Sequence, residues 1–79
     1  MPKLKNIPYR QFEKALLKLG CKLIRKQGSH KVFTREGLNR PIVIPFHGNN
    51  KTVALFVIQN NLRLLKIPAE TFIETLKRI

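Results

Sequence analysis

The amino-acid sequence predicts an α+β fold with the element order α-β-β-β-α-α, in which a three-stranded antiparallel sheet packs with one face against helices. Two patterns predict this fold. Apolar residues recur at helical spacing near both ends of the chain, and the middle consists of three short strand-like runs separated by glycine-containing turns. With 79 residues the chain is long enough for one domain with a thin core. We therefore expect a single domain over residues 1–79.

The first helix is predicted over residues 8–19, where apolar side chains follow the i, i+3, i+4, i+7 spacing of one helix face. These side chains are Phe12, Ala15, Leu16 and Leu19. Pro8 suits the first turn, because the N–H that proline lacks would have no partner within the helix there. Gly20 suits the position just after the helix, where a left-handed backbone is common.

Three strands are predicted next, at Cys21–Gln27, His30–Arg35 and Pro41–Phe46. Gly28 separates the first two, and residues 36–39 (Glu-Gly-Leu-Asn) form a hairpin turn before the third. In the second strand, alternation places two sets of side chains on opposite faces. One set is Lys31, Phe33 and Arg35, and the other is His30, Val32 and Thr34. Apolar residues occur in both sets, so the sequence does not decide which face of this strand is buried.

Two helices are predicted after the break at residues 48–50 (Gly-Asn-Asn). Thr52 is expected to cap a helix that runs to about Leu65 and is interrupted by Ile67-Pro68. Its apolar stripe is Leu55, Ile58, Leu62 and Leu65. A last helix, from about Ala69 to Arg78, is expected to bury Phe72, Ile73 and Leu76.

The chain is strongly basic, with 16 Lys and Arg against 4 Asp and Glu and a formal charge of +12. Because self-repulsion of this size costs stability, it indicates a polyanionic ligand: nucleic acid, an acidic protein or an anionic membrane surface. A membrane is disfavoured, since no apolar run approaches the roughly 20 residues of a spanning helix and no signal peptide is visible. The basic residues are spread along the whole chain, which, for a nucleic-acid ligand, favours contact with the backbone over sequence readout.

Cys21 is the only cysteine, which excludes an internal disulfide and a multi-cysteine zinc site. We interpret it as a small core residue, and a reducing, cytoplasmic location fits best. No cofactor is predicted, because the sequence contains no cofactor-binding motif. No metal site is predicted either, because no carboxylate lies close in sequence to complete one with the two histidines.

The most informative motif is Gly28-Ser29-His30, at the predicted start of the second strand. Histidine takes up and releases a proton near neutral pH, and the surrounding positive charge would hold a polyanion in place. A second histidine, His47, follows the third strand. These features together indicate chemistry on a phosphodiester.

Residues 20–33 (GCKLIRKQGSHKVF) resemble the signature of the HicA toxins, also called the YcfA-like family. In that family a glycine ends the first helix, a basic strand follows, and a Gly-Ser-His motif comes next. Residues 43–49 resemble the second family block, an apolar strand ending in Pro-x-His, and residues 62–72 resemble the last segment. Two departures are visible: residues 35–37 (Arg-Glu-Gly) stand where many members have a His-Pro turn, and residues 52–57 lack the usual Gly-Thr-Leu start.

The resemblance implies a double-stranded-RNA-binding-like fold. It also implies the toxin of a type II toxin–antitoxin system, a metal-independent endoribonuclease that cleaves messenger RNA and arrests translation. It implies a HicB-type antitoxin that covers the active site, and the charge of the chain predicts that this partner is acidic. By position, His30 matches the family's catalytic histidine, with Gly28 and Ser29 as its motif neighbours.

RNA can be cut without a metal when its own 2′-OH attacks the adjacent phosphorus, which requires a base, stabilisation of the phosphorane and a proton for the leaving oxygen. We expect His30 to be the base, Gly28 to allow close approach of the backbone, and Ser29 to orient His30 or donate to a phosphate oxygen. The predicted RNA-binding residues are Arg25, Lys26, Lys31 and Arg35.

His47 is the candidate for a supporting catalytic role. A turn centred near Leu38 would place His30 opposite Phe46, with His47 beside it, and a shift of one residue would bring the two histidines directly opposite each other. They would then form an acid/base pair. The alternatives are that His47 bonds to the loop that follows it, or contacts RNA or a partner.

Two other functions stay open. A non-catalytic module would bind structured RNA by shape with the same fold and charge. A DNA-binding regulator would need polar base-reading residues at the start of a recognition helix, and the predicted helix over residues 52–65 is too apolar for this. Tyr9 and Phe33 are the candidates for stacking on bases.

Overall fold

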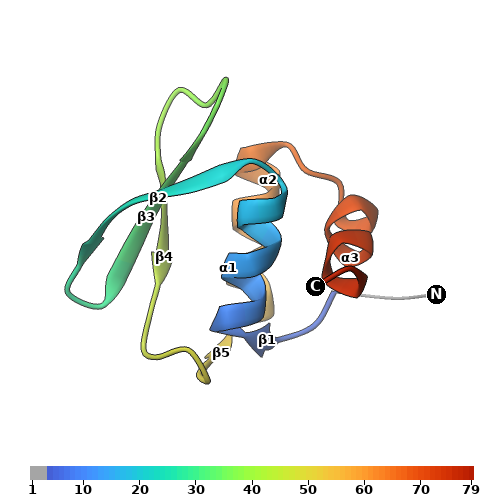
Figure 1. Ribbon diagram of the computed structural model, residues 1–79, viewed down its shortest axis with the longest axis horizontal. Coiled ribbons are helices and arrows are strands. Elements are labelled where there is room, and N and C mark those ends of the chain that lie inside the picture. Colours follow the sequence, from blue (N-terminus) through green and yellow to red (C-terminus); the bar gives the residue numbers. More distant parts are fainter. Residues whose placement is uncertain (1–3) are drawn as a thin grey trace.

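The computed structural model describes residues 4–79. In chain order the elements of this part are β1 (Ile7–Pro8), α1 (Tyr9–Lys18), β2 (Cys21–Gln27), β3 (His30–Arg35), β4 (Ile42–Pro45), β5 (Thr52–Val53), α2 (Leu55–Leu65) and α3 (Ala69–Lys77). The sheet of β2, β3 and β4 lies on one side of α1, and α3 lies on the other side (Figure 1). The predicted α+β class and the order of the six main elements are confirmed.

The main sheet is antiparallel, with the strand order β2-β3-β4. The register between β3 and β4 runs from His30 opposite Pro45 to Phe33 opposite Ile42. Between β2 and β3 the register shifts around Ile24, which is an extra residue in β2 and forms a β-bulge. This shift decides which side chains of β2 share a face with His30.

A second, two-stranded sheet was not predicted from the sequence. β1 pairs with β5 through Ile7 opposite Val53 and Pro8 opposite Thr52. Thr52 is therefore a strand residue, and the prediction that it caps a helix is wrong. The helix begins at Leu55, whose backbone N–H donates to Asn6 Oδ1 at 2.7 Å. A residue far away in sequence thus satisfies the helix end.

The core lies between α1 and the face of the sheet that contains Phe33, Ile42 and Ile44. Phe33 is completely buried, as is Phe12 from α1, so the face shared by Lys31, Phe33 and Arg35 is the covered one. The predicted stripe of α2 also reaches this core, where Ile58, Leu62 and Leu65 are buried and Leu55 is half-buried.

The last helix packs on α1 instead of the sheet. Phe72 is fully buried, and its ring meets Phe12 edge-on with 5.7 Å between the ring centroids. Ile73 and Leu76, which were also expected to be buried, are half-buried. The prediction that all helices pack on one face of the sheet thus holds for α1 and α2, while α3 forms a further layer.

The helix ends follow the predicted backbone chemistry within one residue, apart from the start of α2. Gly20 follows α1 with a φ of 96°, and Lys66 ends α2 with a left-handed φ of 59°. Pro68 then precedes α3 as its N-terminal flanking residue. Within residues 4–79, no helix has the length and apolar character needed to cross a membrane.

Cys21 is buried at the start of β2, as predicted for a core residue. Burial raises the pKa of its thiol, and the nearby Arg35 charge offsets part of this rise. The thiol is therefore kept in its unreactive, protonated form near neutral pH.

Phe72→Ala should lower the free energy of unfolding by about 3–5 kcal/mol, because it opens a cavity between α1 and α3. Phe56→Ala is the matched control, since Phe56 is 72% exposed on α2 and its truncation should change stability by less than about 0.5 kcal/mol. Urea denaturation followed by circular dichroism measures both. Equal midpoints for the two variants would contradict this packing of α3.

Candidate functional site

The Gly-Ser-His motif forms a tight turn at the tip of the β2–β3 hairpin. Gln27 pairs with His30, which leaves Gly28 and Ser29 as a two-residue loop. Gly28 has a φ of 56° whereas Ser29 lies outside the left-handed region, a pattern typical of a type II′ turn with glycine first. The Phe46 N–H donates to the Ser29 carbonyl at 2.7 Å, so pairing with the chain after β4 continues to the tip of the hairpin.

His30 is exposed on the face of the sheet that α1 does not cover. Residues directly opposite each other in antiparallel strands share a face, so Gln27 and Pro45 flank His30 on that face. We call this surface the open face, and alternation and register assign to it Lys22, Arg25, Gln27, His30, Val32, Thr34, Val43 and Pro45.

The two-residue turn places Arg25 on the open face, because it sets Gln27 opposite His30 and alternation then sets Arg25 opposite Val32. Arg25 thus lies diagonally across the strands from His30. The β-bulge at Ile24 adds Lys22 to this face, since without the extra residue the register set by the turn would place Lys22 opposite Arg35, on the covered side. Strands β2, β3 and β4 contain five Lys and Arg and no Asp or Glu, so no acidic side chain from these strands neutralises this surface.

Lys31 lies on the covered side, in a cluster with Tyr9, Glu13 and Phe46. Its Nζ is 3.2 Å from Glu13 Oε1, 4.8 Å from the centroid of the Tyr9 ring and 4.0 Å from that of Phe46. The Tyr9 hydroxyl donates to the same Glu13 oxygen at 2.5 Å. Burial, and then this hydrogen bond, raise the pKa of Tyr9 well above its usual value. The Lys31 charge is thus already paired inside the molecule.

The predicted RNA-binding residues are therefore divided between the two faces. Arg25 lies on the open face with His30, while Lys31 and Arg35 face the helices, where Arg35 Nη1 donates to the Leu65 carbonyl at 3.1 Å. Lys26 pairs with Lys31, and its exposed side chain places Nζ 5.1 Å from the Phe46 ring centroid.

Tyr9 and Phe33 do not serve as base-stacking platforms. Tyr9 is 1% exposed and Phe33 is completely buried, so neither ring is available to a base, and that interpretation is wrong. Both rings contribute to the core instead.

His47 is exposed just beyond the end of β4. The predicted pairing of His30 with Phe46 is wrong by one residue, because the β3–β4 turn is centred between Gly37 and Leu38. The shift is opposite in direction to the one that would place the two histidines face to face, so their direct opposition is also wrong. Any other role of His47 stays a prediction.

Sequence reasoning missed Gln27 as the cross-strand neighbour of His30. The signal was present, since a two-residue Gly-Ser loop pairs the residues on either side of it. The bulge that brings Lys22 to the same face had no such signal. Among residues 4–79, no three His, Cys, Asp or Glu side chains are grouped closely enough to hold a metal ion.

In a comparison with protein-family models, residues 9–67 match the family described as HicA toxin of bacterial toxin-antitoxin. This segment runs from the start of α1 past the end of α2, and it includes the hairpin and the whole open face. No curated protein and no solved structure matched the chain.

Gly28→Ala should lower the free energy of unfolding by about 1–2 kcal/mol, because alanine is strained at a φ of 56°. A Cβ placed there meets no atom within 4 Å, so the cost comes from the backbone alone. Ser29→Ala, at the next exposed position, should change stability by less than about 0.5 kcal/mol. Thermal unfolding of both variants tests the turn, and an unchanged Gly28→Ala midpoint would argue against it.

Proposed function

The chain belongs to the HicA toxin family of bacterial toxin–antitoxin systems, and from this premise we propose that it is an endoribonuclease that cleaves messenger RNA. The observation that supports this best is the position of His30. It is exposed at the tip of a hairpin, on a sheet face that includes Arg25 and has no acidic residue from its strands. A base and a cation on one surface are what the reaction needs.

In the proposed reaction His30, with a neutral imidazole, removes the proton from a ribose 2′-OH. The 2′-oxygen forms a bond to the adjacent phosphorus, the bond from phosphorus to the 5′-oxygen breaks, and a cyclic phosphate results. The leaving 5′-oxygen takes a proton from solvent, to which the exposed His30 surface is open. Because the nucleophile belongs to the substrate, this route requires no metal ion.

Arg25 is the residue best placed to neutralise the phosphate that reacts. It lies diagonally across the strands from His30, within the reach of a long side chain. A guanidinium group donates two parallel hydrogen bonds to phosphate oxygens, which also orients the group. Gln27, directly opposite His30, is a neutral side chain that can donate to a ribose or phosphate oxygen. Gly28 and Ser29 present their backbone at the same tip.

The toxin family implies a system with an antitoxin partner. We propose that this partner is an acidic HicB-type protein that covers the open face in the cytoplasm. With a formal charge of +12, the chain favours fast, salt-sensitive association with such a protein.

His30→Ala should lower the rate of RNA cleavage by roughly 10²- to 10⁴-fold, the usual contribution of a general base. A defined messenger RNA is digested in EDTA by the native chain and by the variant, and circular dichroism confirms that both are folded. Because His30 is exposed, the variant should retain the fold and the binding of RNA.

Equal cleavage by the two proteins would overturn the role of His30. If neither cleaves and both retain RNA in a salt-dependent manner, the chain is the alternative, a non-catalytic RNA-binding module.

Arg25→Gln and Arg35→Gln remove the same charge from opposite faces of the sheet. Arg25→Gln should reduce the slope of log K against log salt concentration for single-stranded RNA by about 0.7, the value for one lost phosphate contact. Arg35→Gln should leave the slope unchanged and lower stability, since it removes the hydrogen bond to Leu65. Titrations of RNA at several salt concentrations measure both slopes. Equal changes of slope in the two variants would show that RNA binding depends on total charge and not on the face of the sheet.

A further inference from the structure

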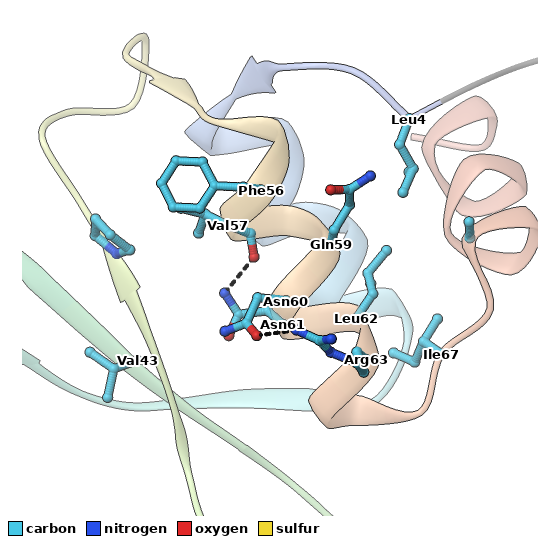
Figure 2. Close-up of a pocket in the computed structure, with 12 residues that line it drawn as sticks. Leu4, Val43, Phe56, Val57, Gln59, Asn60, Asn61, Leu62, Arg63 and Ile67 are labelled. Carbon is cyan, nitrogen blue, oxygen red and sulfur yellow. Dashed lines mark hydrogen bonds between the residues drawn. The ribbon is translucent and has the colours of Figure 1, made fainter.

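A groove of about 790 Å³ begins between β4 and α2, beside the open face, and runs along α2 as far as Leu4, Ile67 and Ala69 (Figure 2). Val43 and Pro45 form its wall on β4. The wall on α2 comes from a run of side chains that includes Phe56, Asn60 and Arg63. Its volume is within the range of sites that bind small organic molecules.

The groove is next to the proposed catalytic residue. Pro45 lines the groove and is also the residue directly opposite His30, and Val43 lines it opposite Val32. Paired strands lie about 4.8 Å apart, so only the width of one strand separates His30 from the groove. A strand of RNA whose phosphate contacts His30 would therefore have an adjacent base within reach of the groove.

The polar groups of the groove are mainly amides held in fixed orientations. Arg63 Nη2 donates to Asn60 Oδ1 at 2.8 Å, which leaves the Asn60 NH₂ group free to donate. Asn61, only 4% exposed, donates through Nδ2 to the Val57 carbonyl at 2.9 Å, and its Oδ1 is left as an acceptor. Side-chain amides with fixed donors and acceptors are typical readers of base edges.

The groove also offers flat apolar contact. Phe56 is 72% exposed, and Figure 2 shows its ring extending from α2 toward β4, with the amides of Asn60 and Asn61 between the helix and that strand. No acidic residue lines the groove, and Arg63 gives it a positive charge. A nucleobase has apolar faces and a polar edge, and it is attached to an anionic backbone, so it fits all three properties.

We propose that this groove binds one nucleobase of the RNA substrate, next to the phosphate at His30, and selects the sequence that is cleaved. This inference rests on the proposed function, and it assigns a base-reading role to α2. Phe56 stacks on the base, and Asn60 and Asn61 bond to its edge. The open face then holds the backbone without regard to sequence.

The test measures binding and not cleavage. Four oligoribonucleotides of A, C, G or U, with every 2′-OH methylated to prevent cleavage, are titrated into the native chain, Phe56→Ala and Asn60→Ala. Leu64→Ala is the matched control, since Leu64 is an exposed apolar residue of the same helix outside the groove. Phe56→Ala should weaken binding of the preferred oligonucleotide about tenfold. Asn60→Ala should lower the ratio between the highest and the lowest affinity among the four oligonucleotides by about fivefold or more. Leu64→Ala should change neither.

If Phe56→Ala and Asn60→Ala bind all four oligonucleotides as the native chain does, the base site is overturned, whether or not the native chain cleaves RNA. If these variants lose base preference while the native chain cleaves nothing, the base site stands and the proposed nuclease function fails. If they bind RNA normally and lose only an acidic partner protein, the groove is a protein-docking surface and the proposal is overturned.

Discussion

The burial of Phe33 against α1 is the constraint on which the rest of the site depends. Side chains alternate along a strand, so placing Phe33 in the core also turns Lys31 and Arg35 inward and His30 outward. An inward lysine is costly unless it is paired. Here the Lys31 ammonium group is paired with the Glu13 carboxylate and contacts the rings of Tyr9 and Phe46, which offsets the cost of its burial. The exposure of His30 and the pairing of Lys31 are thus two results of one register.

Two features of the β2–β3 hairpin, the turn and the bulge, modify that register. Gly28 permits a two-residue turn, which sets Gln27 opposite His30 and Arg25 opposite Val32, on the face of His30, and the bulge at Ile24 adds Lys22 to that face. Each device costs some regularity in the sheet. The turn places an imidazole, an amide and a guanidinium on one surface, while the opposite surface remains available for the core. One face of the sheet therefore forms the core, and the other face exposes these polar and basic side chains.

Local patterns predicted most of the fold, and contacts between distant segments account for the differences. The helix of Phe12 and Leu16, the three strands and the Gly-Ser-His turn follow from periodicity and glycine chemistry. The pairing of Pro8 with Thr52 and the cap that Asn6 provides to Leu55 join residues more than 40 positions apart, so no local signal marks them. The register was wrong by one residue because loop geometry sets the centre of a turn. The groove requires β4 and α2 to meet, which no local pattern shows.

The formal charge of +12 overstates the charge of the open face, the surface to which we assign RNA binding. Lys31 is neutralised by Glu13, and the Arg35 guanidinium bonds to a carbonyl on the covered side. Lys22 and Arg25 are the Lys and Arg residues of the open face, and Arg63 adds a charge in the groove. In the proposed complex, so few basic side chains near His30 would contact phosphates that attraction to the RNA backbone alone would position the strand loosely. A groove that binds one base would hold the RNA strand in place next to His30. The same contact would make cleavage depend on the RNA sequence.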